Sequence, residues 1–228
     1  MSSFFITFEG GDGSGKSTQA RLLAAQLEAA GRAVRLTREP GGTPLAGAMR
    51  ALLLHPEASL QALAHANLTP GEELSEPMLP LTEALLLSAA RAQHVARIRA
   101  WLNAGETVIS DRYADATLAY QGYARGYDLD ALRTLERLAT DGLRPRLTLL
   151  LDVPIEEGQR RKRAGHQDGD ELNRLDTEAL TFHQRVRDGY LTLAREEPSR
   201  WVVFDATAAP GALAEQVWRA VSERLDLA

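Results

Sequence analysis

The chain has 228 residues, a formal net charge of −5 and no cysteine, and 44% of its residues are hydrophobic. This length and apolar content suit one α/β domain with a full core, so we expect a single domain over residues 1–228. The acidic balance argues against nucleic acid or an anionic membrane as a partner, and the lack of cysteine excludes disulfides and thiol chemistry. No signal peptide and no bilayer-spanning run is apparent, so we expect a cytoplasmic protein.

Five short apolar runs predict buried β-strands, at 4–8, 33–36, 107–109, 147–151 and 201–204. Helical patterns predict helices over 18–30, 81–103, 129–141, 176–196 and 212–225. Because strands alternate with helices, we expect an α/β fold of three layers, in which helices flank a five-stranded parallel sheet.

Two segments depart from this pattern. Residues 55–80 contain four prolines and a glutamate cluster, which predicts an irregular insertion or a partly mobile loop. Residues 158–175 begin with a basic run at 160–163 and then become polar, with Gly165 and Gly169. That composition is typical of a mobile lid.

A phosphate-binding loop is predicted between the first strand and the first helix. The sequence from Gly10 to Ser17 matches the pattern G-x-x-x-x-G-K-[ST]. Glycines let backbone N–H groups turn inward around a phosphate, and the following helix start adds partial positive charge. A glycine-rich turn with a chance lysine is the alternative, which the flanking strand and helix disfavour. We therefore expect a P-loop NTPase-like fold, with the ATP-binding residues Gly10, Gly11, Asp12, Gly13, Ser14, Gly15, Lys16, Ser17 and Thr18.

One residue of this loop and one residue after the third predicted strand are candidate Mg²⁺ ligands. They are the Ser17 hydroxyl, at the metal position of the pattern, and Asp111, which follows the strand 107–109. Arg112, the next residue, can grip a phosphate through two N–H groups. A surface ion pair at the strand end is the alternative.

Two further segments are candidates for phosphate contacts. The Thr-Arg-Glu-Pro-Gly-Gly-Thr turn at 37–43 would aim Arg38 or Glu39 into the same crevice, unless it is a plain turn. The phosphate loop contains no arginine. We therefore expect an arginine from the basic run to stabilise the transferred phosphoryl group, the alternative being a solvated helix face.

Taken together, these motifs resemble those of bacterial thymidylate kinases. The matching pieces are 8–17, 37–43, Arg50, 89–94, 111–113, 119–122 and 205–207, which span nearly the whole chain. The resemblance implies transfer of a phosphoryl group from ATP to dTMP, giving dTDP and ADP, with Mg²⁺ as the cofactor. It also implies a homodimer and a catalytic arginine in the lid rather than in the phosphate loop.

The resemblance further implies roles for individual residues. The implied catalytic residues are Lys16, Arg163, Arg112 and Asp12, with Arg161 and Arg174 as alternatives to Arg163. The implied dTMP-binding residues are Asp12, Arg38, Glu39, Pro40, Arg50, Leu87, Arg91, Arg112, Thr117, Tyr120 and Gln121. Among them, Arg91 would reach the thymine carbonyl, and Tyr120 would pack where a ribose 2′-hydroxyl would clash.

The chain departs from the family pattern at three places. Leu87 stands where a phenylalanine usually stacks on thymine, which removes an aromatic term of about 0.5–1.5 kcal/mol. The lid reads Asn-Arg-Leu-Asp at 173–176, where Asp-Arg-Phe-Glu is usual, and it is longer than is typical. The stretch 55–80 is also longer than usual.

Other functions compete with this interpretation. One is a kinase for another nucleoside monophosphate or a nucleoside, and another is a GTPase-like switch or a non-catalytic P-loop module. A switch would need an N-K-x-D motif, which the sequence lacks, and a silent module would be expected to lose Lys16 or Asp111, which are both present.

Overall fold

The computed structural model describes residues 3–65, 77–165, 175 and 178–224. Within them a five-stranded sheet has the order β2-β3-β1-β4-β5, and all neighbouring strands run parallel. The strands are β1 (Phe5–Glu9), β2 (Val34–Arg38), β3 (Thr107–Asp111), β4 (Leu147–Asp152) and β5 (Trp201–Asp205). The predicted parallel sheet is therefore confirmed.

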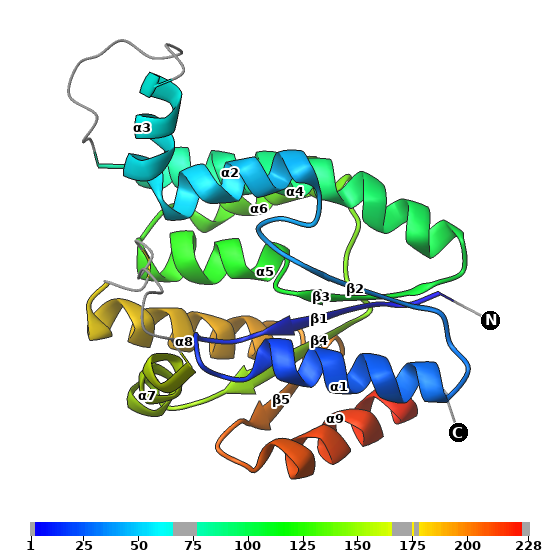
Figure 1. Ribbon diagram of the computed structural model, residues 1–228. Coiled ribbons are helices and arrows are strands. Elements are labelled where there is room, and N and C mark those ends of the chain that lie inside the picture. The colour runs from blue at the N-terminus through cyan, green and yellow to red at the C-terminus, as the bar shows by residue number, and fades with distance from the viewer. Residues whose placement is uncertain (1–2, 66–76, 166–174, 176–177, 225–228) are drawn as a thin grey trace.

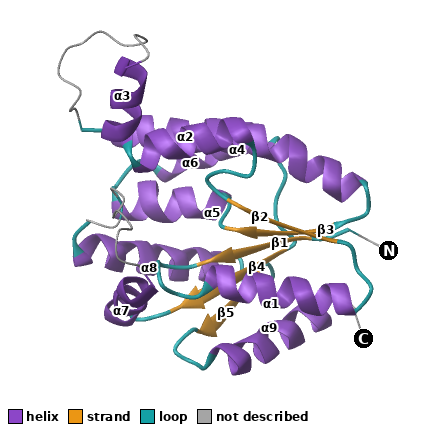
Figure 2. Cartoon of the chain, viewed as in Figure 1, coloured by secondary structure: helices purple, strands orange, loops and turns teal. Residues whose placement is uncertain are grey.

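Helices cover both faces of the sheet (Figure 1, Figure 2). On one face α1 (Lys16–Ala29) packs against α9 (Pro210–Arg224). The other face carries α4 (Pro80–Asn103), α6 (Leu129–Thr140), α8 (Leu180–Glu196), and the short α5 (Ala114–Thr117) continuing into a π-helical turn η1 (Leu118–Ala124). The remaining helices are α2 (Pro44–Leu54), which packs on α4, α3 (Pro56–His65), and α7 (Ile155–Gly165), which contacts α8. No helix in the described ranges is long and apolar enough to cross a membrane.

The central strand β1 contributes side chains to the hydrophobic core on both faces of the sheet, because alternate side chains of a strand point to opposite faces. Ile6 and Phe8 are fully buried with the side chains of α1 and α9. Phe5 belongs to the core on the α4 side, where its ring meets the edge of Tyr113 at 4.8 Å between centroids. Each such large apolar side chain contributes about 1.5–3 kcal/mol when it is fully buried.

The structure corrects the expectation that all five strands are buried. β2 and β5 lie at the two edges of the sheet, and Leu36 and Val203 are each 46% exposed. An edge strand pairs with a neighbour on one side only, so part of it stays open to solvent.

Several helices were not predicted. α2 begins at Pro44 after Thr43, whose side chain accepts a hydrogen bond from the Ala46 N–H at 3.2 Å. This cap and the proline at the first helical position are typical start signals. α3 lies inside the segment 55–80, which is therefore not irregular throughout, and α7 forms the first part of the predicted lid. Residues 166–174 of that lid lie outside the described residues.

Candidate active site

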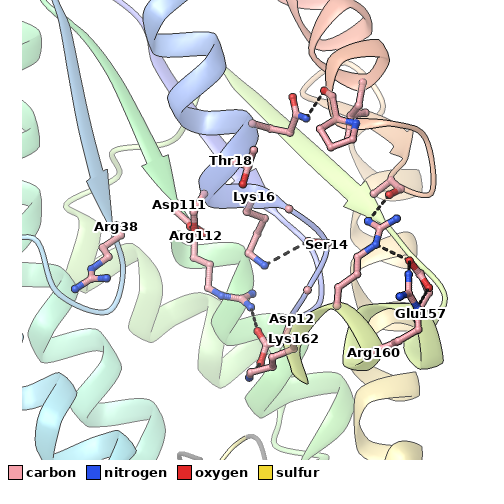
Figure 3. Close-up of a pocket in the computed structure, with 18 of the residues that line it drawn as sticks. Asp12, Ser14, Lys16, Thr18, Arg38, Asp111, Arg112, Glu157, Arg160 and Lys162 are labelled. Carbon is pink, nitrogen blue, oxygen red and sulfur yellow. Dashed lines mark hydrogen bonds and ion pairs between the residues drawn. The ribbon is translucent and has the colours of Figure 1, made fainter. Parts of the chain in front are cut away.

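The carboxyl edge of the sheet carries a cavity of about 650 Å³ around the P-loop, termed here the P-loop cavity (Figure 3). The predicted residues that line it are Asp12, Gly13, Ser14, Gly15, Lys16, Ser17, Thr18, Arg38, Glu39, Arg50, Asp111 and Arg112. Figure 3 shows Arg38 on one side of Lys16 and Arg112, with Glu157 and Arg160 of α7 on the other. The fold thus gathers residues from the P-loop, α1, β2, β3 and α7 at one place.

Glycine is required at several points of the loop. Gly10 and Gly13 have φ angles of 137° and 71°, which side-chain-bearing residues rarely adopt. A Cβ on Gly10 would also lie 2.4 Å from the carbonyl oxygen of Leu151 on β4. The loop therefore lies directly on neighbouring backbone, and its shape depends on these glycines.

Lys16 folds back onto the loop that precedes it. Its Nζ donates to the carbonyl oxygen of Gly11 at 2.7 Å and to Ser14 Oγ at 3.4 Å. Burial, and next the charge of Arg112, lower the pKa of Lys16 to about 8. A phosphate on the loop would supply the anion that this buried ammonium group lacks.

Asp12 joins the P-loop to two cations from distant parts of the chain. Its carboxylate accepts from Arg112 Nη2 and from Lys162 Nζ, each at 2.7 Å. Burial alone would raise the pKa of Asp12, but Arg112, Lys16 and Lys162 outweigh it, so the pKa lies well below its usual range. Asp12 is therefore ionised, and it holds Arg112 and Lys162 beside the loop.

Arg112 is fixed from several directions. Its Nη1 donates to the Gly10 carbonyl oxygen at 2.9 Å and to the Tyr190 hydroxyl at 3.0 Å, and its Nη2 also donates to the Tyr120 hydroxyl at 3.0 Å. Its guanidinium carbon lies 5.1 Å from the centre of the Tyr120 ring. Held in this way, Arg112 presents a preorganised positive charge.

Three arginines gather at the P-loop cavity, and within the described ranges only one of them, Arg112, forms an ion pair, with Asp12. Arg38, Arg50 and Arg112 all line the P-loop cavity. Burial, and next the charges of Arg38 and Arg112, lower the pKa of Arg50. Mutual repulsion of this kind is relieved by a bound anion, so the cluster is suited to a phosphate group.

The two candidate metal ligands are neighbours, since the Ser17 hydroxyl donates to Asp111 Oδ2. No cluster of three or more His, Asp or Glu side chains suited to a metal is found among the described residues. Mg²⁺ commonly uses one or two protein oxygens and completes its shell with water and substrate phosphates. A hydroxyl and a carboxylate beside a phosphate loop fit that requirement.

A second cavity of about 310 Å³, termed here the inner cavity, adjoins the first. Both are lined by Asp12, Glu39, Arg50, Arg112 and Lys162. The predicted dTMP-binding residues that line the inner cavity are Asp12, Glu39, Pro40, Arg50, Leu87, Arg91, Arg112, Thr117, Tyr120 and Gln121. Arg38, the remaining one, lines only the P-loop cavity.

Arg91 is held in the wall of the inner cavity by buried carboxylates. Its Nε donates to Glu39 Oε2 at 2.7 Å, and its Nη1 donates to Glu136 Oε2 at 2.5 Å and to Thr117 Oγ1 at 3.1 Å. Its Nη2 donates to the Tyr113 carbonyl oxygen at 3.2 Å. Guanidinium has five N–H donors, so this network leaves one Nη2 hydrogen for another acceptor.

Gln121 offers the opposite polarity in the same cavity. It is 1% exposed, and its Nε2 donates to Glu83 Oε1. Its Oε1 is buried and has no hydrogen-bond partner in the described structure. Arg91 and Gln121 therefore both line the inner cavity, and each keeps hydrogen-bonding capacity that its described contacts do not use.

The predicted catalytic arginine is placed differently from its neighbours. Arg163 Nη2 donates to Gln159 Oε1 at 3.4 Å, and Arg163 lines a cavity of about 480 Å³ between α7 and α8. The residues of the basic run that line the P-loop cavity are Arg160, Arg161 and Lys162. The alternative Arg174 lies outside the described residues.

Sequence reasoning missed four residues that shape the site. Lys162 contacts Asp12, and Tyr190 contacts Arg112. Glu136 accepts a hydrogen bond from Arg91, and Glu83 accepts one from Gln121. Glu136 had a detectable signal, because it is a charge four residues after Leu132 on the buried side of α6. Tyr190 had no such signal in the sequence, because the residues that it contacts, Glu9 and Arg112, are far from it along the chain.

The fold and its two adjoining cavities define a P-loop kinase of the nucleoside monophosphate kinase class. A family model described as thymidylate kinase matches residues 8–217. The thymidylate kinase of Syntrophotalea carbinolica is 47% identical over 228 residues, covering 99% of this chain and 98% of its own length. That of Thermomicrobium roseum is 49% identical over 222 residues, covering 97% and 95%. The chain therefore belongs to the thymidylate kinase family.

A solved structure supports the same conclusion for the fold. The crystal structure of thymidylate kinase from Ehrlichia chaffeensis matches with a TM-score of 0.64 and 34% sequence identity. The match covers 90% of this chain and 93% of that chain. The P-loop NTPase-like fold predicted from the sequence is thereby confirmed.

Proposed function

We propose that the enzyme transfers the γ-phosphoryl group of ATP to the 5′-phosphate of dTMP, giving ADP and dTDP. The observation that carries this proposal is the junction of the two cavities at Asp12, Arg112 and Lys162. ATP on the P-loop and a nucleoside monophosphate in the inner cavity would bring their phosphates together there. Phosphoryl transfer needs such positioning and charge neutralisation, with no covalent intermediate on the enzyme.

The P-loop cavity supplies the donor half of the reaction. Lys16 and the start of α1 would neutralise the β- and γ-phosphates of ATP. Ser17 and Asp111 would hold Mg²⁺, which when bound offsets the negative charge on the phosphate oxygens. Arg112 stands between the two halves and would bind the acceptor phosphate together with Arg38 and Arg50.

The inner cavity supplies the acceptor half. The spare Arg91 N–H matches the O4 carbonyl of thymine, and the spare Gln121 oxygen matches its N3–H. Cytosine carries an amino donor where thymine carries O4, so it would place donor against donor. Leu87 would cover the base, and Tyr120 would stand beside the sugar.

We further propose that the enzyme acts as a homodimer in the cytoplasm. Support for the dimer comes from large apolar side chains on the outer helices, where Leu45 of α2 and Leu85 of α4 are 53% and 49% exposed. Exposed apolar groups of this size are common at subunit interfaces. Sedimentation equilibrium should give twice the chain mass, and a purely monomeric enzyme would contradict the proposal.

The proposed activity is tested by ADP release with Mg²⁺ and ATP across a panel of dTMP, dUMP, dCMP, dAMP, dGMP and UMP. We expect dTMP to have the highest kcat/KM and UMP to be poor. A higher kcat/KM for another monophosphate would reassign the acceptor. Loss of ADP release for every member of the panel would remove the kinase assignment.

A further inference from the structure

Glu83 is a fully buried carboxylate of α4 that sits behind the inner cavity rather than in its wall. It accepts a hydrogen bond from Gln121 Nε2, and Arg125 Nε donates to its Oε1 at 3.3 Å. Arg125 is itself fixed, because its Nη2 donates to Glu178 Oε1 at 2.7 Å and its guanidinium lies 4.8 Å from the centre of the Phe182 ring. The pairing with Arg125 makes Glu83 a rigid acceptor next to Gln121.

This pairing decides which way the Gln121 amide faces. The Glu83 carboxylate pairs with the Arg125 guanidinium, and a carboxylate paired in this way accepts hydrogen bonds, so the Gln121 amide turns its NH₂ group toward Glu83. The Gln121 oxygen must then point the other way, and it is this atom that is buried without a partner in the described structure. If the amide were reversed, two acceptors would face each other at Glu83, and the cavity would gain a donor in place of an acceptor.

Selection of the base follows from that orientation. On the proposed function, on which this inference rests, the base in the inner cavity meets the Arg91 donor and the Gln121 acceptor. Thymine and uracil offer an acceptor at O4 and a donor at N3, whereas cytosine offers a donor amino group and an acceptor N3. A fixed acceptor at Gln121 therefore favours bases with an N3–H. An amide that turns freely could offer either its oxygen or its NH₂ group, and would not discriminate between the two kinds of base.

We propose that Glu83 is a positioning residue that locks the amide of Gln121 and thereby makes the enzyme select pyrimidines with an N3–H over cytosine. Glu83 touches neither substrate nor phosphate in this assignment. It acts only through Gln121, so its loss should change the choice between bases more than the handling of ATP.

The test is Glu83→Gln, measured as kcat/KM for dTMP and for dCMP with Mg²⁺ and ATP. The new amide can donate as well as accept, so Gln121 becomes free to turn. We expect the ratio of kcat/KM for dTMP over dCMP to fall by about tenfold or more, through a raised KM for dTMP, with the KM for ATP unchanged. Equal losses for both substrates, leaving the ratio as in the wild type, would overturn the proposal.

Glu178→Gln is the matched control, since it removes the other carboxylate on Arg125 but does not contact Gln121. It should keep the wild-type ratio, and an equal fall there would show that Arg125, not Glu83, governs the choice of base. Gln121→Met, of similar length, should lower the ratio as Glu83→Gln does. A retained ratio in Gln121→Met overturns the proposal even if Glu83→Gln does not fold.

The outcome also separates this inference from the proposed function. A wild-type enzyme that does not phosphorylate dTMP would remove the proposed function. A wild-type preference for dTMP that survives unchanged in Glu83→Gln removes only the role of Glu83.

Discussion

Gly13 of the P-loop and Gly158 of α7 meet backbone to backbone. A Cβ on Gly13 would lie 1.9 Å from the carbonyl oxygen of Gly158, and a Cβ on Gly158 would lie 2.6 Å from that of Asp12. α7 also carries Arg160, Arg161 and Lys162 onto the P-loop cavity. The contact between the two glycines therefore sets how close the basic run comes to the phosphate site.

Gly158→Ala tests this contact. The added methyl must push α7 away from Asp12, which we expect to cost about 1–3 kcal/mol of folding stability and to lower kcat. Thermal unfolding and steady-state kinetics measure the two effects. Gly211→Ala on α9 is the control, since nothing lies within 4 Å of its added Cβ. A Gly158→Ala enzyme with wild-type kcat would show that the spacing of α7 has no part in turnover.

Lys16→Ala should abolish turnover while the fold survives. Among the described residues the ammonium group donates hydrogen bonds to Gly11 and Ser14 of its own loop, so we expect its loss to remove little packing. Loss of a charge aimed at the transferred phosphoryl group lowers kcat by about a hundredfold or more. ADP release and circular dichroism check the two parts of this prediction. Arg35→Ala is the control, because it removes a cation from the exposed side of β2, and it should keep full activity. Full activity in Lys16→Ala would contradict the P-loop assignment.

Lys162 and Arg163 are two alternative candidates for the side chain whose positive charge stabilises the transferred phosphoryl group. The sequence favours Arg163, but in the structure Lys162 pairs with Asp12 and lines both the P-loop and the inner cavity. We expect Lys162→Met to lower kcat by about tenfold or more and Arg163→Met to lower it less, with little change in either KM. The reverse order in single-turnover rates would support Arg163, acting from a different side-chain position.

The four consecutive basic residues show why the sequence could not settle this point. Neighbours on a helix point about 100° apart, so the residue that faces the cavity depends on how α7 is rotated. That rotation is set by the contact with Gly13, which is distant in the sequence. The P-loop itself could be predicted, because its strand, glycines and helix are adjacent along the chain.

The same reasoning explains the other differences. Hydrophobic periodicity predicted the five strands and the major helices, since it is a local property. The exposure of Leu36 and Val203 depends on which strands form the edges, and strand order is not a local property. The pairing of Arg91 with Glu136 likewise needs α4 and α6 to lie side by side. Sequence therefore predicted the groups that line the two cavities better than the buried groups that hold them.

Leu87→Phe should tighten dTMP binding modestly. Leu87 lines the inner cavity, where an aromatic ring would stack on the base and contribute about 0.5–1.5 kcal/mol. Isothermal titration with dTMP should then give a Kd lowered by about two- to tenfold. Leu22→Phe, on the exposed side of α1, should leave the Kd unchanged. An unchanged or raised Kd in Leu87→Phe would show that this side chain does not face the base.

Glu9 links stability to pH. It lies fully buried at the end of β1, where it accepts hydrogen bonds from the Tyr113 N–H at 2.7 Å and the Tyr190 hydroxyl at 2.8 Å. Burial, and next the charge of Asp115, raise the pKa of Glu9 from 4.5 to about 8. Between these values the folded chain keeps a proton that the unfolded chain releases. The stabilisation is therefore complete below the unfolded pKa and is lost as the pH rises through the folded one.

We expect the free energy of unfolding to fall by up to about 4 kcal/mol between pH 5 and pH 8.5 on account of Glu9. Urea unfolding across this range measures the slope. Glu9→Gln keeps an acceptor for the Tyr113 N–H and removes the titration, so its stability should depend less on pH than that of the wild type. Glu28→Gln, which removes a carboxylate from the exposed face of α1, should retain the wild-type slope. Equal slopes in the wild type and Glu9→Gln would mean that Glu9 is ionised throughout, and that Arg112 and Tyr190 outweigh the effect of burial.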